Sequence, residues 1–93
     1  MKKTYLISYD LGMPETSTDY AKLISHIKSL GTWATPLKSQ WFVVSEKTTS
    51  EIRTELQNFI DANDKILVID VTKDAWATWG IDKAVTSWMK DNI

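Results

Sequence analysis

The first strand-like run of the chain places one carboxylate, Asp10, at the point where the run ends. Residues 3–9 are rich in β-forming side chains, and Leu11 and Gly12 lead into a loop. A single acid at the end of a first strand is a common position for a metal-dependent site, and an equally common turn residue. Asp10 is therefore the candidate catalytic and metal-ligating residue, with a turn as the alternative role.

The chain contains five tryptophans, a high number for 93 residues. Trp33 and Trp41 lie in neighbouring strand-like stretches and could approach each other, whereas Trp76 and Trp79 follow the last strand in a loop with little periodicity. Indole faces stack on nucleobases with roughly 1–3 kcal/mol per base, so these positions favour nucleotide binding. The alternative is that the loop folds back and fills an open sheet face.

Lys38 and Ser39 separate the two strands that carry Trp33 and Trp41, and they could contact phosphate or simply form a polar turn. The candidate ligand-binding residues are therefore Tyr9, Lys38, Ser39, Trp41, Trp76 and Trp79.

Two other charged positions are weaker candidates. His26, the only histidine, is expected on an exposed helix face, because the sequence places no acid to orient it. Arg53 falls in the first turn of a predicted helix, where the helix dipole mildly disfavours a cation. Its placement hints at pairing with Glu46 or with an anion.

The composition excludes several classes of function. With 93 residues, one domain is expected, with a core over residues 1–72 and a C-terminal loop and helix over residues 73–93. The absence of cysteine excludes disulfides, thiolate zinc sites and cysteine nucleophiles. A net charge of −1 provides no basic field for nucleic acid. No apolar run is long enough to cross a membrane and no leader sequence is evident, so a cytoplasmic location is expected.

Hydrophobic periodicity predicts a regular alternation of strands and helices. Strands are predicted at 3–9, 32–37, 40–45 and 65–71. The first helix is capped by Thr16 or Ser17 and ended by Gly31, and the second begins with the capping box Thr48–Glu51 and buries Ile52, Leu56, Phe59 and Ile60. A short terminal helix is predicted from the spacing of Ile81, Val85, Trp88 and Met89.

This order of elements predicts an α+β protein. Right-handed crossovers around two helices give a four-stranded antiparallel sheet with both helices on one face, which is the ferredoxin-like βαββαβ arrangement. The other face of the sheet needs a cover, either the C-terminal segment or a second copy of the chain. Because the aromatic residues exceed what one small core needs, a homodimer is expected.

Four short segments form a pattern along the chain. They are Ser8-Tyr9-Asp10 at the end of the first strand, Leu30-Gly31 at the end of the first helix, the hairpin at 38–44, and residues 60–69, where a short acidic turn precedes the last strand. Together they resemble the small CRISPR-associated Cas-two family and its stand-alone, SinR-type relatives, over residues 3–72. The resemblance implies a dimer of ferredoxin-like protomers whose sheets face each other across a two-fold axis.

The resemblance also implies a chemistry for Asp10. In the metal-dependent members of that family, the matching acids of two protomers converge near the two-fold axis. Two such carboxylates attract Mg²⁺ or Mn²⁺, which can polarise a phosphoryl oxygen and activate water for phosphodiester cleavage. Residues 12–19 depart from the nuclease-like members, because they are acidic and rich in hydroxyl groups instead of basic. This departure argues against binding of duplex nucleic acid.

The combined expectation is a Cas-two-like homodimer that binds a nucleotide or nucleic-acid ligand, with vestigial metal-dependent phosphodiesterase or endonuclease chemistry at Asp10. Two alternatives stay open at this point. One is a non-catalytic, sponge-like protein that binds a nucleotide signal in phage or bacterial defence. The other is an interaction scaffold for a partner protein, with no ligand of its own.

Overall fold

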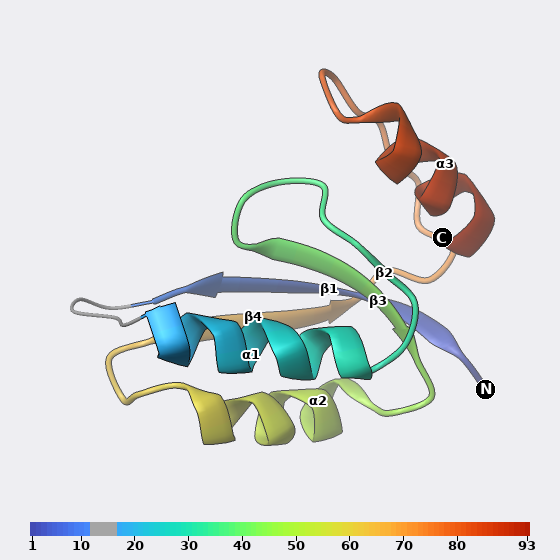
Figure 1. Ribbon diagram of the computed structural model, residues 1–93. Helices are drawn as coiled ribbons and strands as arrows, with labels where there is room; N and C mark the ends of the chain where they lie inside the picture. The colour runs from blue at the N-terminus through green and yellow to red at the C-terminus, as the bar shows by residue number, and fades with distance from the viewer. Residues whose placement is uncertain (12–16) are drawn as a thin grey trace.

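Four antiparallel strands form the sheet around which the chain is organised (Figure 1). This computed structural model describes residues 1–11 and 17–93. The strands are β1 (Lys3–Asp10), β2 (Trp33–Ala34), β3 (Gln40–Ser45) and β4 (Lys65–Asp70), in the order β2-β3-β1-β4. The helical elements are α1 (Ser17–Ser29), α2 (Thr49–Leu56), the 3₁₀ turn η1 (Gln57–Phe59) and α3 (Lys83–Asn92). The expected α+β class and the four-stranded antiparallel sheet are confirmed.

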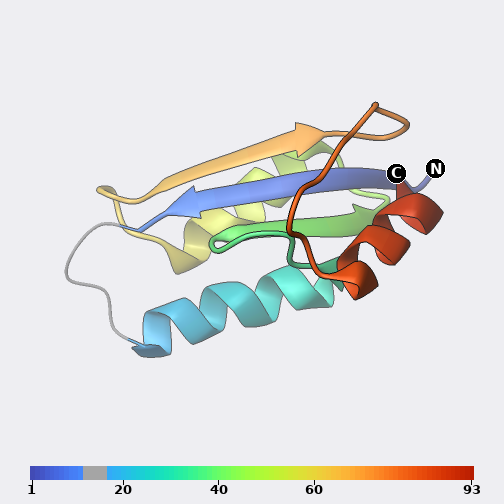
Figure 2. The same ribbon diagram turned by 90° about the horizontal axis from the view of Figure 1, so that it is seen from above.

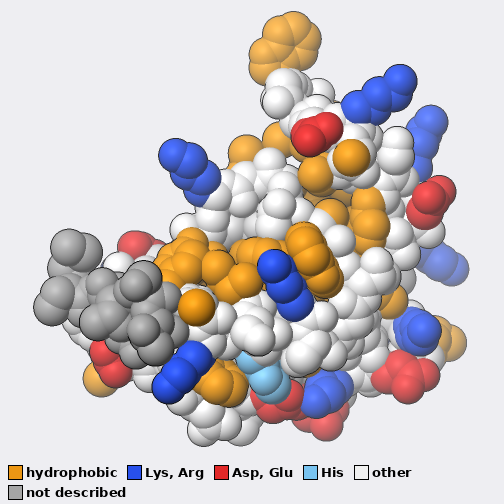
Figure 3. Space-filling model, in the orientation of Figure 1, with side chains coloured by type: hydrophobic (Ala, Val, Ile, Leu, Met, Phe, Trp, Pro, Cys, Tyr) orange, Lys and Arg blue, Asp and Glu red, His pale blue; other side chains and the backbone are white. Residues whose placement is uncertain are grey.

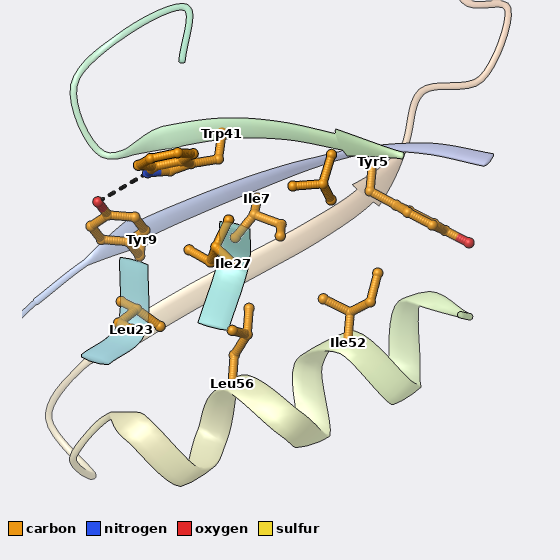
Figure 4. Close-up of a cluster of buried hydrophobic side chains, with 9 residues drawn as sticks. Tyr5, Ile7, Tyr9, Leu23, Ile27, Trp41, Ile52 and Leu56 are labelled. Carbon is orange, nitrogen blue, oxygen red and sulfur yellow. Dashed lines mark hydrogen bonds between the residues drawn. The ribbon is translucent and has the colours of Figure 1, made fainter. Parts of the chain in front are cut away.

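Alternation along β1 divides its side chains between the two faces of the sheet. Tyr5, Ile7 and Tyr9 share one face, as the sequence predicts, and all three are buried. α1 and α2 cover this face (Figure 1). The core is completed by buried side chains from both helices and from β3, namely Leu23, Ile27, Trp41, Val43, Ile52 and Leu56 (Figure 4).

The opposite face of the sheet, called the open face below, is partly covered by the C-terminal part of the chain. α3 and the segment before it lie on this side, and the segment crosses β1 and β3 (Figures 1 and 2). The ring of Trp88 stacks on Phe42 with 6.0 Å between centroids, and Trp88 Nε1 donates a 3.0 Å hydrogen bond to Thr32 Oγ1. Thr4 Oγ1 donates to the carbonyl oxygen of Asn92. These contacts hold α3 at one end of the open face.

Two elements are shorter than the sequence predicts. The strand expected at 32–37 is reduced to the two residues of β2, because Pro36 has no N–H group to donate to a strand ladder. The second helix tightens into η1 before residue 60. The capping box is confirmed, since Thr48 Oγ1 accepts from the Glu51 N–H at 3.1 Å and the Glu51 carboxylate accepts from the Thr48 N–H at 3.0 Å.

Gly31 occupies the tight passage from α1 to β2. A Cβ atom at this position would lie 2.0 Å from the carbonyl oxygen of Val44. No L-residue with a side chain fits there without a shift of the backbone. The glycine expected as a helix terminator is therefore also required by the close approach of β3.

Part of the connection between β1 and α1 is outside the described residues. The turn expected at Gly12 and Pro14 and the cap expected from the Thr16 or Ser17 side chain fall there. Within residues 1–11 and 17–93, no helix combines the length and the apolar character that spanning a membrane would require.

Candidate functional site

Three polar aromatic groups meet where β1, β3 and α1 come together. Tyr9 is 6% exposed, and its hydroxyl donates a 2.8 Å hydrogen bond to the Tyr20 hydroxyl. Trp41 Nε1 donates to the Tyr9 oxygen at 3.3 Å (Figure 4). Burial, followed by the hydrogen bond with Tyr20, raises the pKa of Tyr9 to about 12. The Tyr9 hydroxyl therefore stays protonated at neutral pH and acts as a fixed hydrogen-bonding group.

A groove of about 500 Å³ opens beside these aromatic groups. Tyr9 and Trp41 line it from the sheet, Tyr20 and Ile24 line it from α1, and residues 35–39 of the β2–β3 loop form the other wall. Four of the six candidate ligand-binding residues thus lie around one cavity, although 32 positions separate the first from the last.

The β2–β3 loop is held in a defined shape at this groove. Ser39 adopts a left-handed conformation with φ of 59°, and its carbonyl oxygen accepts the Tyr9 N–H at 3.1 Å. The Gln40 N–H donates to the Leu37 carbonyl oxygen at 3.2 Å. The expected hairpin between β2 and β3 is confirmed, but its connection spans residues 35–39 instead of the two residues Lys38 and Ser39, because β2 ends at Ala34. Lys38 and Ser39 lie in a turn, and the exposed Lys38 side chain lines the groove.

A lysine lies over two indole rings next to the groove. Trp33 and Trp41 approach each other with 5.1 Å between ring centroids, as their positions on neighbouring strands predict. The Lys28 ammonium nitrogen is 4.8 Å from the Trp33 ring and 5.7 Å from the Trp41 ring, close enough for a cation–π interaction with each. Figure 3 shows hydrophobic side chains gathered into a surface patch with Lys or Arg side chains upon it.

This arrangement suits a flat ligand that carries negative charge. The exposed part of Trp33 and the apolar lining offer stacking surface, while the ammonium groups of Lys28 and Lys38 can neutralise an anionic group. The lining contains Tyr, Ser and Lys but no carboxylate and no imidazole. The groove thus offers hydroxyl groups, an ammonium group and aromatic surface to a ligand.

The remaining two tryptophan candidates lie elsewhere. Trp76 and Trp79 belong to the segment between β4 and α3 and do not line the groove. Trp79 is 97% exposed, so the loop does not fill the open face with this side chain. Sequence spacing could not reveal this, because the loop has no periodic pattern that ties it to a surface.

Asp10 is exposed at the end of β1 and shares the open face with its register partner Lys65. Among the described residues, no three His, Asp or Glu side chains are grouped so that they could hold a metal ion. One described protomer therefore does not provide a complete Mg²⁺ or Mn²⁺ site at Asp10. A metal there would need further ligands, such as the matching acid of a second protomer.

A polar network between the helices was not predicted from the sequence. His26 Nε2 lies 2.8 Å from Glu55 Oε1, and Lys47 Nζ donates to Glu55 Oε2 at 2.5 Å. The hydrogen bond from Lys47 is the main cause that lowers the pKa of Glu55. His26 is half-buried against Phe59, with 5.0 Å between ring centroids, so its expected solvent-exposed position is wrong. Its partner is 29 positions away, and local spacing gives no signal for such a contact.

Arg53 makes no side-chain ion pair with any other described residue, and the pairing expected with Glu46 is not present. Its side chain lines two neighbouring depressions of about 220 and 580 Å³. Ile66 of β4 lines both depressions with it. Arg53 thus presents a cation beside the outer strand of the sheet.

Comparison with known proteins informs the fold. No protein-family model matches the chain. The chain is similar to the crystal structure of a hypothetical protein, TT1823, from Thermus thermophilus, with a TM-score of 0.66 and 20% sequence identity over 88% of this chain and 96% of that one. At this identity the similarity concerns the fold alone, and it places the four-stranded sheet with its helices among known architectures.

Proposed function

We propose that this protein binds a nucleotide or a short single-stranded nucleic acid in the groove between α1 and the β2–β3 loop. The observation that carries the proposal is the convergence of Tyr9, Lys38, Ser39 and Trp41 around one cavity of about 500 Å³. A base can stack on the exposed indole of Trp33, and its phosphate can approach the ammonium groups at the groove. The net charge of −1 supports a small or single-stranded ligand over a duplex.

Tryptophan fluorescence tests this proposal directly. The chain is titrated with mononucleotides, cyclic dinucleotides and short RNA, each with and without Mg²⁺. We expect quenching by at least one ligand, and Lys38→Ala should weaken binding by roughly fivefold, as expected for one exposed charge contact of about 1 kcal/mol. Lys22→Ala is the matched control, because Lys22 is exposed on α1 and does not line the groove.

Two results would redirect the proposal. If Trp76→Ala or Trp79→Ala abolishes quenching while Lys38→Ala does not, the ligand binds at the exposed segment before α3. If no ligand changes the fluorescence, the binding proposal fails and an interaction scaffold becomes the better explanation. Binding without turnover would correspond to a sponge-like protein that sequesters a nucleotide signal in phage or bacterial defence.

The proposal includes a ferredoxin-like fold and a homodimer of the Cas-two-like kind. The order of elements, the sheet order β2-β3-β1-β4 and the position of α1 and α2 on one face support the ferredoxin-like assignment. Exposed apolar side chains on β4, Leu67 at 55% and Ile69 at 41%, support a second copy as partner.

Phosphodiester cleavage at Asp10 is the second candidate function. It is favoured by the exposure of this carboxylate at the end of β1, with the cation of Lys65 opposite it in the ladder. The test is hydrolysis of RNA and DNA substrates with Mg²⁺ or Mn²⁺, in the wild type and in Asp10→Asn. Activity that requires metal and disappears in Asp10→Asn would support cleavage, whereas no activity with either metal would refute it.

A further inference from the structure

The backbone of β4 has a definite inner and outer side. At one end of its ladder with β1, the Val71 N–H donates to the Thr4 carbonyl oxygen at 2.9 Å. On the other side of β1, the Tyr9 N–H donates to the Ser39 carbonyl oxygen. The backbone N–H and C=O groups of successive residues in an antiparallel strand point alternately to its two neighbouring strands. The backbone groups of the even-numbered residues of β1 therefore point towards β4. By the observed register, the backbone N–H and C=O groups of Leu67 and Ile69 point back towards β1.

The polar backbone groups of Ile66, Val68 and Asp70 therefore point away from the sheet. Among the strands of residues 1–11 and 17–93, β4 is an outer strand with β1 as its one neighbour (Figure 2). Outer strands of stable monomers are normally protected by charge, proline or a bulge. Residues 66–69 are four consecutive apolar residues, and all six residues of β4 pair in unbroken register with β1. This edge is consequently open to another strand.

We propose that β4 of a second copy of this chain pairs with this edge in antiparallel orientation, with the two-fold axis beside Val68. The inference rests on the homodimer in the proposed function, but it places the interface at the outer edge of the sheet instead of between two facing sheets, and it does not depend on ligand binding. Val68 then pairs with the partner's Val68, and Ile66 pairs with the partner's Asp70. The backbone groups of Ile66, Val68 and Asp70, which point away from β1, then all have hydrogen-bonding partners in the other protomer. The two four-stranded sheets join into one continuous sheet.

The neighbouring register, with the axis beside Leu67, fits less well. In that register, only the outward-pointing backbone groups of Ile66 and Val68 would pair with residues of the partner's β4. It would also set Asp70 opposite the partner's Asp64, and two like charges directly opposite each other are destabilising. In the register centred on Val68, Leu67 instead faces the partner's Ile69 on the open face. These are the two most exposed large apolar side chains of the sheet's long strands, and both become covered.

Charge complementarity supports the same register. Asp70 lies on the helix-covered side of the strand, as does Ile66, because both are even-numbered. In its own chain the Asp70 carboxylate lies 3.5 Å from Lys3 Nζ and accepts hydrogen bonds from Thr72, so the partner's Arg53 would be a second cation beside it. Pairing with Ile66 brings the partner's Asp70 to the depressions that Arg53 lines beside Ile66. Two-fold symmetry creates this arginine–carboxylate contact twice. Arg53, which has no ion-pair partner among the described residues of its own chain, acquires one in the dimer.

This interface differs from a dimer in which two open faces meet. α3 already occupies part of the open face, where Trp88 stacks on Phe42. A substitution at Val68 distinguishes the two dimers. The Val68 side chain lies on the helix-covered side, packed against the core, so in a dimer of two facing open faces it would be remote from the partner. The edge-paired dimer also separates the two Asp10 carboxylates, so it counts against a shared metal site.

A disulfide trap tests the register. The chain has no cysteine, so Val68→Cys introduces one thiol per protomer. Across a hydrogen-bonded pair the Cα atoms are about 5.5 Å apart, within the range for a disulfide, whereas Leu67→Cys would meet its own mate only on a diagonal of about 7–8 Å. Each variant is oxidised, and the covalent dimer is quantified on a non-reducing gel.

We expect a covalent dimer from Val68→Cys and little from Leu67→Cys. Dominant cross-linking of Leu67→Cys would overturn the register. Light scattering first establishes the mass of the wild-type chain. A monomer at a chain concentration of about 100 µM, which lies between millimolar and micromolar dissociation constants, would overturn both the homodimer and this interface. A dimeric wild type in which Val68→Cys does not cross-link would overturn the interface alone.

A charge swap provides the second measurement. Arg53→Asp should weaken the dimer several-fold, because it faces the partner's Asp70 with a like charge. Combining it with Asp70→Arg should restore the dimer, while circular dichroism checks that each variant is folded. Lys22→Asp, an equal change of charge on an exposed α1 position, is the control. Equal dimer constants for Arg53→Asp and the control would refute the Arg53 contact.

Discussion

Removal of the Tyr9 hydroxyl is the sharpest test of how the candidate site is held together. In Tyr9→Phe the ring can remain in the core, but Trp41 Nε1 loses its acceptor at 3.3 Å and the Tyr20 hydroxyl loses a donor at 2.8 Å. Trp41 is 7% exposed, so water has little access to its N–H group. A buried donor left without a partner costs about 1–3 kcal/mol. Because the lost bond is long, we expect the lower half of that range.

The assay is chemical and thermal unfolding, followed by far-ultraviolet circular dichroism. For a domain of this size, about 1 kcal/mol corresponds to a shift of roughly 4–8 °C in Tm. A double-mutant cycle with Trp41→Phe isolates the hydrogen bond between Trp41 and Tyr9. The indole surface lost in Trp41→Phe is the same with Tyr or Phe at position 9, so it cancels in the cycle. A coupling free energy of about 0.5–1.5 kcal/mol is expected between the two sites.

Alkaline pH gives an independent readout of the same hydroxyl. The pKa of Tyr9 is raised from 10.0 to about 12 in the folded chain, so folding favours the protonated form. The corresponding stabilisation is fully present below pH 10 and is lost as the pH rises towards 12. Stability of the wild type should therefore fall more steeply over this interval than that of Tyr9→Phe. Parallel pH profiles, together with no coupling in the cycle, would refute the reasoning.

Three further predictions concern the packing around the site. Gly31→Ala should destabilise the fold by about 1–3 kcal/mol in urea unfolding, because its Cβ meets the Val44 carbonyl oxygen at 2.0 Å; an unchanged midpoint would contradict the close approach. The pKa of Glu55 is lowered chiefly by the hydrogen bond from Lys47, so its contribution is present above the unfolded pKa and is lost as the pH falls through the folded value. Glu55→Gln should thus flatten the acid limb of the stability profile, and an unaltered limb would argue against the network. Trp88→Ala should speed amide hydrogen exchange across α3 but leave exchange in the sheet unchanged; equal protection in both proteins would show that other contacts hold the helix.

The strands and helices were predictable because their signals are local. Alternation placed Tyr5, Ile7 and Tyr9 on one face, and the capping box fixed the start of α2. The hairpin placed Trp33 next to Trp41. These features depend on residues within a few positions of one another, or on the pairing of adjacent strands.

The groove was only partly predictable, since its walls come from separate parts of the chain. Its residues in β1 and in the hairpin were identified from their types, but the contribution of Tyr20 and Ile24 depends on how α1 crosses the sheet. The contact of His26 with Glu55 is likewise set by the packing of one helix on another. Sequence periodicity defines which face of a helix is buried, but not which residue of a second helix it meets.

The contacts of α3 have a consequence for the order in which the chain folds. Thr4 bonds to Asn92 across 88 positions, and Trp88 bonds to Thr32 across 56. Closing such long loops costs conformational entropy. The contacts of α3 can offset this cost only when the surface that they bind, formed by β1 and the start of β2, is already folded. The sheet and the helices on its first face can therefore assemble before α3 docks. During synthesis, the last helix leaves the ribosome after the surface that receives it, so the open face stays transiently accessible on the nascent chain.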